Sequence, residues 1–223
     1  MDIFLIIISY LVFLLSTTFH EAAHAFVAKL GGDLTAYHSG QVTLDPMAHI
    51  KREPFGMVVM PVIFLILYKW PFGWASTPYD PLWAREHHRK AAIMALAGPM
   101  ANLLLAVIAG VILKIGLLQH FFDPMDIFGN LYLDSSGTSL SGIVRMLRLT
   151  FFINLILFVL NLLPLPSLDG SSVITIFMPK SMANTFSETI NNPALSLLSL
   201  FIAWQIFPYI FEPIYSFARQ IFF

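Results

Sequence analysis

The chain has 223 residues, of which 57% are hydrophobic and 11% are charged, and it contains no cysteine. A soluble domain usually carries about 25% charged residues, so this composition predicts an integral membrane protein. The net charge of −1 argues against a nucleic-acid partner, and the lack of cysteine excludes disulfides, thiol nucleophiles and thiolate metal sites.

The first predicted element is a helix over residues 3–30, which is long enough to cross the hydrocarbon core of a bilayer and ends at "GGD", residues 31–33. We expect this helix to be retained and not cleaved as a signal peptide, because Met1 and Asp2 provide no basic n-region. A polar loop is predicted over residues 33–53.

The next segment, residues 54–79, is apolar at first but short, and it is interrupted by Pro61. It continues into "WPFGWASTPYDPLW", which is too rich in Pro and Gly to be a long regular helix. We expect this segment to enter the membrane and return to the same side, covered there by protein or lining a water-filled cavity. Trp70, Trp74 and Trp83 could alternatively anchor it at the headgroup region.

Three further apolar segments are predicted at 91–118, 149–163 and 194–216, the last one kinked near Pro208 and Pro213. The predicted fold class is therefore an all-α polytopic membrane protein, a bundle of about four to six transmembrane helices with a re-entrant segment that could contain a β-hairpin. We expect one membrane domain over residues 1–223, with a catalytic core at 3–175 and an extra C-terminal membrane segment at 194–216.

Basic residues predict the orientation of the chain. The two loops before residue 91 contain most of them, whereas the loop at 119–140 has none and carries three aspartates; the basic residues are Lys29, Lys51, Arg52, Lys69, Arg85, Arg89 and Lys90. The positive-inside rule then places both early loops in the cytoplasm and the 119–140 loop outside. Arg145 and Arg148, near the external start of the third span, count against this scheme.

A cluster of ionisable residues, "HEAAH" at 20–24, lies inside the first predicted helix. His20 and His24 are at positions i and i+4, so they share a helix face and can bind one zinc ion, while Glu21 can act as the general base for a zinc-bound water. Two histidines that only satisfy each other or the backbone are the alternative. That alternative is weaker in a membrane helix, where ionisable groups are costly and usually functional.

A catalytic zinc needs a third protein ligand, and Asp169 in "NLLPLPSLDG" is the candidate. If segment 54–79 returns to its own side, the first and third spans run in the same direction. Asp169 then lies at the cytoplasmic side with His20 and His24, whereas a full crossing at 54–69 would place it on the opposite side. The alternative is that Asp169 is only a helix cap or part of an Asp-Gly turn.

Together these motifs resemble the site-2 protease family of intramembrane zinc metalloproteases. The resemblance covers residues 3–175 and rests on "HEAAH" at 20–24, "GPMAN" at 98–102 and "NLLPLPSLDG" at 161–170, in the order found in the family. The chain is most similar to the compact prokaryotic branch, which also has counterparts of "GGD", "LDPMAHI" and "FGWASTP" at 31–33, 44–50 and 72–78. Nothing in the sequence could form the PDZ or CBS domains of other branches.

The resemblance implies that His20, His24 and Asp169 bind one zinc ion and that Glu21 activates the water. It also implies that Asn161 and Asn102 lie near the active site, where either amide could hold the substrate backbone or the developing oxyanion. Interhelical hydrogen bonding is the alternative for both asparagines, and it is as well supported as a direct role for Asn102. Further expectations concern Gly98-Pro99, which would allow close helix approach or a kink, and His49, which could support the site or a substrate loop.

The predicted function is hydrolysis of peptide bonds in or near transmembrane segments, as in regulated intramembrane proteolysis. The expected partners are a single-span membrane protein as substrate and the lipid bilayer, and the expected location is a prokaryotic plasma membrane with the active site toward the cytoplasm. An extended edge at "FGWASTP" could bind an unwound substrate as an added strand. A membrane zinc or proton transporter using the same polar residues is the main alternative, and a scaffold that binds membrane helices without catalysis is a third.

Overall fold

Four helices in the described part of the chain are long and apolar enough to cross a membrane. They are α1 (Ile3–Gly31), α6 (His88–Leu118), α8 (Ser139–Asn161) and α11 (Pro193–Phe222). The computed structural model describes residues 3–128, 139–190 and 192–223. It confirms the predicted all-α, multi-pass membrane protein, and no β-strand occurs within these residues.

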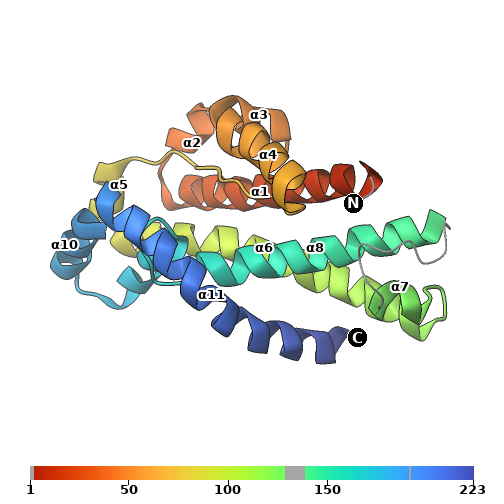
Figure 1. The fold of residues 1–223 in the computed structure, drawn as a ribbon. Helices are drawn as coiled ribbons and strands as arrows, with labels where there is room; N and C mark the ends of the chain where they lie inside the picture. The colour runs from red at the N-terminus through yellow and green to blue at the C-terminus, as the bar shows by residue number, and fades with distance from the viewer. Residues whose placement is uncertain (1–2, 129–138, 191) are drawn as a thin grey trace.

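The three helices α1, α6 and α8 lie side by side, with α6 running opposite to the other two (Figure 1). Their interfaces contain small residues of α6 such as Ala106 and Ala109, which let the helix backbones approach closely in a membrane. Because α1 and α8 run in the same direction, the residues that follow α8 reach the end of the bundle where α1 also ends. The expected relative direction of the first and third spans is therefore correct.

The fourth long helix, α11, packs against α8 through aromatic side chains. Phe211 contacts Phe152 with ring centroids 5.6 Å apart, and Tyr215 contacts the same ring at 5.0 Å. The predicted segment 194–216 is part of this longer helix, which includes Pro208 and Pro213. Near its start, the Ser199 hydroxyl donates a hydrogen bond to the Pro166 carbonyl in the loop after α8.

The region between α1 and α6 differs from a plain loop. Two short helices, α2 (Thr35–His38) and α3 (Pro46–Arg52), occupy part of the predicted loop at 33–53. Asp45 caps α3 by accepting a hydrogen bond from the Met47 amide, and Pro46 fits the first turn, so a local capping signal explains this helix.

The chain then enters the bundle and returns, as expected for a re-entrant segment. A π-helical turn (Phe55–Val59) leads into α4 (Met60–Tyr68), and residues 71–80 come back without helix or strand to α5 (Pro81–Glu86). The β-hairpin considered for this segment is not present in the described residues, since one arm is helical. The returning arm passes close to the π-helical turn: a Cβ on Gly73 would lie 2.1 Å from the Gly56 carbonyl oxygen.

The tip of this re-entrant segment is held by Trp70. Its ring packs with Leu5 and Val12 of α1 and with Leu149 and Ile153 of α8. Trp70 is half-buried in this packing, and the ring of Trp83 is buried at the end of α1, so both rings have partners within the protein. Trp74 is 43% exposed, which is compatible with an anchor at the headgroup region.

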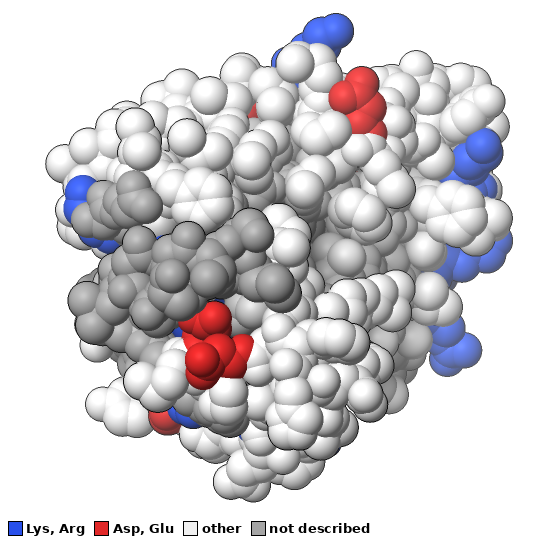
Figure 2. All heavy atoms as spheres, turned by 90° about the vertical axis from the view of Figure 1, so that its right-hand side faces the viewer, with Lys and Arg blue, Asp and Glu red and all other residues white. Residues whose placement is uncertain are grey.

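The third span begins at Ser139, ten residues earlier than the 149–163 segment predicted from hydropathy. Arg145 and Arg148 therefore lie within α8, and this is why they obscured its start. Arg148 donates a hydrogen bond of 2.7 Å to the carbonyl of Asp126 in α7 (Pro124–Phe128), which packs beside this end of α8. Figure 2 shows the end of the molecule that carries α7, where much of the surface is uncharged and an acidic patch stands out.

After α8, the chain forms three short elements at the end of the bundle that also carries α5 (Figure 1). These are α9 (Asp169–Val173), a 3-10 helix (Ile174–Phe177) and α10 (Lys180–Ile190). Asp169 is thus the first residue of a helix and follows the loop that leaves α8.

Candidate metal centre

The site is built on one face of α1. His20 and His24 lie one helical turn apart and are both buried, with 7% and 5% of their surface exposed. Their Nε2 atoms are 3.0 Å apart, so the two rings converge on one point. This is the arrangement that the "HEAAH" spacing predicts.

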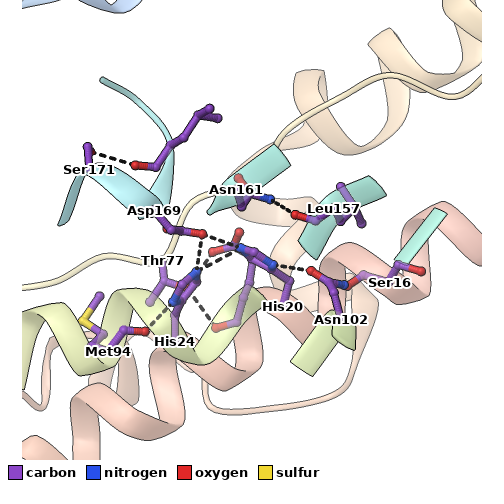
Figure 3. A network of polar contacts seen from close by, with 12 residues as sticks. Ser16, His20, His24, Thr77, Met94, Asn102, Leu157, Asn161, Asp169 and Ser171 are labelled. Carbon is purple, nitrogen blue, oxygen red and sulfur yellow. Dashed lines mark hydrogen bonds and ion pairs between the residues drawn. The ribbon is translucent and has the colours of Figure 1, made fainter. Parts of the chain in front are cut away.

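Asp169 completes a triangle of donor atoms with the two histidines (Figure 3). Its Oδ2 atom lies 3.1 Å from His20 Nε2 and 3.4 Å from His24 Nε2. Zinc bonds of about 2.0–2.1 Å in tetrahedral geometry give donor–donor distances of roughly 3.3–3.4 Å, close to the three observed edges. The N-cap of α9 is Leu168 and Asp169 is the first helical residue, so Asp169 is not in the capping position.

Helix α6 fixes the tautomer of both histidines. His24 Nδ1 lies 2.7 Å from the Met94 carbonyl, which can only accept, so His24 Nδ1 carries the proton. His20 Nδ1 lies 2.6 Å from Asn102 Oδ1, and the Asn102 amide nitrogen faces the Ser16 carbonyl, so His20 Nδ1 is also the donor. In the neutral rings both Nε2 atoms would present lone pairs toward each other and toward a carboxylate, so a positive charge, either a proton or a metal ion, has to lie among these three acceptors.

Gly98 lets the two histidine rings pack closely against α6. It lies between Met94 and Asn102 on the same stripe of α6, four residues from each. A Cβ at this position would be 2.3 Å from His24 Nε2 and 2.6 Å from His20 Nε2. Any side chain at this position would therefore collide with both donor atoms, and only glycine lets the two rings pack against α6 in this arrangement. With Asp169 as the third donor, the residues fit a zinc ion.

The third member of the motif, Glu21, is held by the returning arm of the re-entrant segment. The Thr77 hydroxyl lies 2.8 Å from Glu21 Oε2 and 2.9 Å from the Glu21 carbonyl. Glu21 is 6% exposed, so this contact with Thr77 brings a segment 56 residues away in the sequence onto the buried carboxylate. The motif "FGWASTP" drew attention to this segment, but no local signal identified Thr77.

A metal ligand at the third corner of the triangle would have to be an ionised carboxylate.

The other residues considered from the sequence have different positions. Asn102 is fully buried and uses its amide to hold His20, so it is not free to face a substrate. Asn161 donates to the Leu157 carbonyl of its own helix at 3.0 Å, and its amide would have to turn to reach an oxyanion. His49 is a buried residue of α3, and its Nε2 lies 2.9 Å from the Thr43 carbonyl in the preceding loop.

One buried polar residue near the site was missed. Asn154 of α8 accepts a 2.8 Å hydrogen bond from the Asn102 amide and donates one of 2.8 Å to the Ser16 hydroxyl. It belongs to none of the recognised motifs, and an isolated Asn in a membrane helix gives no signal that separates it from ordinary helix packing.

Comparison with known proteins agrees with this geometry. A family model described as peptidase family M50 matches residues 8–203. YwhC of Bacillus subtilis, which is named as a zinc metalloprotease, is 31% identical over 93% of this chain and 85% of its own length. Rip2 of Mycolicibacterium smegmatis, with the same description, is 34% identical over 70% of this chain, which spans about half of that relative (52%). Rip2 of Mycobacterium tuberculosis H37Rv is 27% identical over 91% of this chain and 69% of its own length. No solved structure matches.

Proposed function

The chain belongs to peptidase family M50 and is a zinc metalloprotease, and on that premise we propose that it is an endopeptidase that cuts peptide bonds within the membrane. The observation that carries the proposal is the triangle of two buried histidines, His20 and His24, and the half-buried Asp169, with Glu21 in the same turn of α1 as His20. A membrane helix rarely keeps such groups without a catalytic or transport role.

Each residue of the centre has a separate task in this mechanism. His20, His24 and Asp169 would hold zinc, which when bound supplies the Lewis acidity that activates a water and polarises the scissile carbonyl. Glu21 accepts the proton of the attacking water and delivers it to the leaving amide nitrogen. Thr77 keeps the Glu21 carboxylate in one orientation through its hydroxyl hydrogen bond.

Substrate binding is assigned to the returning arm at residues 71–79. Trp74 donates its amide to the Gly56 carbonyl, and Ser76 accepts a hydrogen bond from Arg52, so alternate residues of the arm pair on one side. In the part of the chain that the structure describes, nothing pairs with the backbone of Gly73, Ala75 or Thr77. The backbone N–H and C=O groups of these residues are therefore available for hydrogen bonds, and Thr77 at the end of the row contacts Glu21. An unwound transmembrane segment can pair with these groups as an added strand.

The proposed setting is a single membrane domain over residues 1–223 in a prokaryotic plasma membrane. The basic residues near α3, α5 and the start of α6 support a cytoplasmic location for the end of the bundle with the metal centre. The proposed substrate is a single-span membrane protein, as in regulated intramembrane proteolysis. Asn161 remains a candidate oxyanion donor only if its amide leaves Leu157 when substrate binds.

The test uses protein purified in detergent and a transmembrane substrate, with zinc measured by elemental analysis. Glu21→Gln should retain zinc and abolish cleavage, because the amide cannot accept the proton. Asp169→Ala should lose both zinc and cleavage. Normal cleavage by Glu21→Gln would disprove the mechanism, and zinc flux into liposomes without cleavage would favour a transporter.

A further inference from the structure

The polar network behind His20 extends beyond its direct partner. Asn102, Asn154 and Ser16 belong to α6, α8 and α1, respectively, and all three are buried, with exposed fractions of 0%, 0% and 2%. They form one connected set of hydrogen bonds where the three helices meet (Figure 3 shows its Asn102 end). In a membrane, buried amides need a defined set of partners, so this set is informative.

Backbone carbonyls fix the direction of every hydrogen bond in the network. The Asn102 nitrogen faces the Ser16 carbonyl at 3.2 Å, and the Asn154 nitrogen faces the Thr150 carbonyl at 2.8 Å. The Ser16 hydroxyl donates to the Val12 carbonyl at 2.7 Å. A carbonyl cannot donate, so neither amide can be turned over without placing two acceptors against each other.

The direction of these hydrogen bonds also determines how Asn102 contacts His20. Asn154 offers its oxygen to the Asn102 nitrogen, and this leaves the Asn102 oxygen to accept from His20 Nδ1. The His20 proton is thereby kept on Nδ1, and Nε2 is free to face His24 and Asp169. If Asn102 lost this constraint, the Nε2–H tautomer would become accessible, and that tautomer cannot bind a metal through Nε2.

We propose that Asn154, supported by Ser16, is a positioning residue for zinc binding, because it orients the Asn102 amide and so sets the tautomer and ring position of His20. The inference rests on the proposed zinc site. It assigns Asn154 no contact with substrate, and its effect on the centre passes through Asn102.

The test is a double-mutant cycle on zinc affinity, measured in detergent by competition with a fluorescent zinc chelator. Leu has the same branching as Asn but no polar atoms, so Asn154→Leu and Asn102→Leu remove the hydrogen bonds with little change of shape. Each single change should weaken zinc binding by about 10- to 100-fold, as is usual for residues that orient a metal ligand. In the Asn102→Leu background, Asn154→Leu should add less than about twofold, because residues that act in series are not additive.

The matched control is Thr18→Val, which removes a fully buried hydroxyl from α1 whose hydrogen bond goes to the Leu14 carbonyl of the same helix. It should leave zinc affinity within about twofold, as expected for a site outside the network. If Asn154→Leu does not fold, Ser16→Ala replaces it in the cycle, with a smaller loss that Asn102→Leu should again absorb. Additive effects, or no effect of Asn154→Leu, would overturn the inference, whereas a wild-type protein without zinc would instead overturn the proposed function.

Discussion

The substitution Gly98→Ala tests the metal centre most directly. The added methyl group would lie 2.3 Å from His24 Nε2, about 1.1 Å short of the 3.4 Å at which ordinary Cβ contacts begin. It would also lie 2.6 Å from His20 Nε2, so both proposed ligand atoms would have to move. Metal–ligand distances tolerate changes of only about 0.2 Å, so we expect a site displaced by this amount to lose zinc.

Movement of α6 cannot relieve the clash cheaply. Met94 and Asn102, four residues on either side of Gly98, hold the Nδ1 atoms of the two histidines. If α6 moved outward to accept the methyl group, both hydrogen bonds would lengthen and the rings would be released. Either response of the structure therefore weakens the centre, and we expect zinc affinity to fall by at least about 100-fold, the upper end for loss of a residue that orients a ligand.

The assay is zinc content and affinity of the purified protein, with thermal unfolding in detergent as a check on folding. Gly110→Ala is the matched control, because it makes the same change on α6 at a position whose nearest neighbour is the Phe222 side chain near the C-terminus, so the shift that the methyl group demands falls on Phe222 and not on the histidines. The control should keep about one zinc per chain, as a single catalytic site requires. A Gly98→Ala protein with unchanged zinc affinity would show that the metal does not lie in the triangle.

Three further predictions concern the segments around the site. Thr77→Val should lower kcat by about 10-fold or more, because it removes a hydrogen bond to the charged Glu21 carboxylate. The zinc content should be unchanged, and loss of zinc would contradict an effect limited to Glu21. Burial raises the pKa of Asp33, but hydrogen bonds from Thr35 and from the amide of Asp80 outweigh it and leave this pKa below its ordinary value. This stabilisation is present above the unfolded pKa of about 3.9 and is lost as pH falls through the folded value, so the melting temperature should fall more steeply below about pH 4 in wild type than in Asp33→Asn. Trp70→Ala should cost about 2–4 kcal/mol of stability by thermal unfolding in detergent, and an unchanged melting temperature would mean that the ring faces lipid.

The part of the site that is local in sequence could be predicted. His20 and His24 converge because four residues make about one helical turn, and this geometry holds wherever the helix lies. Asp169 is 145 residues further along the chain from His24, and only the topology could bring it near. The distribution of Lys and Arg provided that topology, because it required the re-entrant segment to return to its own side.

The remaining parts depend on contacts between distant elements. Thr77 meets Glu21 because the returning arm crosses α1 at one particular depth, and that depth is set by the packing of Trp70 and by the close contact of Gly73 with the π-helical turn. Asn154 meets Asn102 because of the register between α8 and α6. No periodicity within a single helix contains this information.

The start of the third span shows a different limit. Hydropathy alone placed it at residue 149, because Arg145 and Arg148 lower the average of the preceding turns. In the structure, α7 folds against these turns, and Arg148 reaches the Asp126 carbonyl. Hydropathy treats each arginine as exposed to lipid, and it fails where a neighbouring element satisfies the charge.

The antiparallel pairing of α1 and α6 explains why the two rings point inward. His20 and His24 are separated by about 6 Å along α1, whereas their partners Asn102 and Met94 are eight residues, or about 12 Å, apart along α6. Each ring must therefore turn its Nδ1 atom away from the other ring, which brings the two Nε2 atoms together over Gly98. The two partners are not equivalent in sequence, because one histidine is held by a backbone carbonyl and the other by a side chain. Substitution of the Met94 side chain should leave its hydrogen bond to His24 in place, while His20 depends on Asn102 being an asparagine.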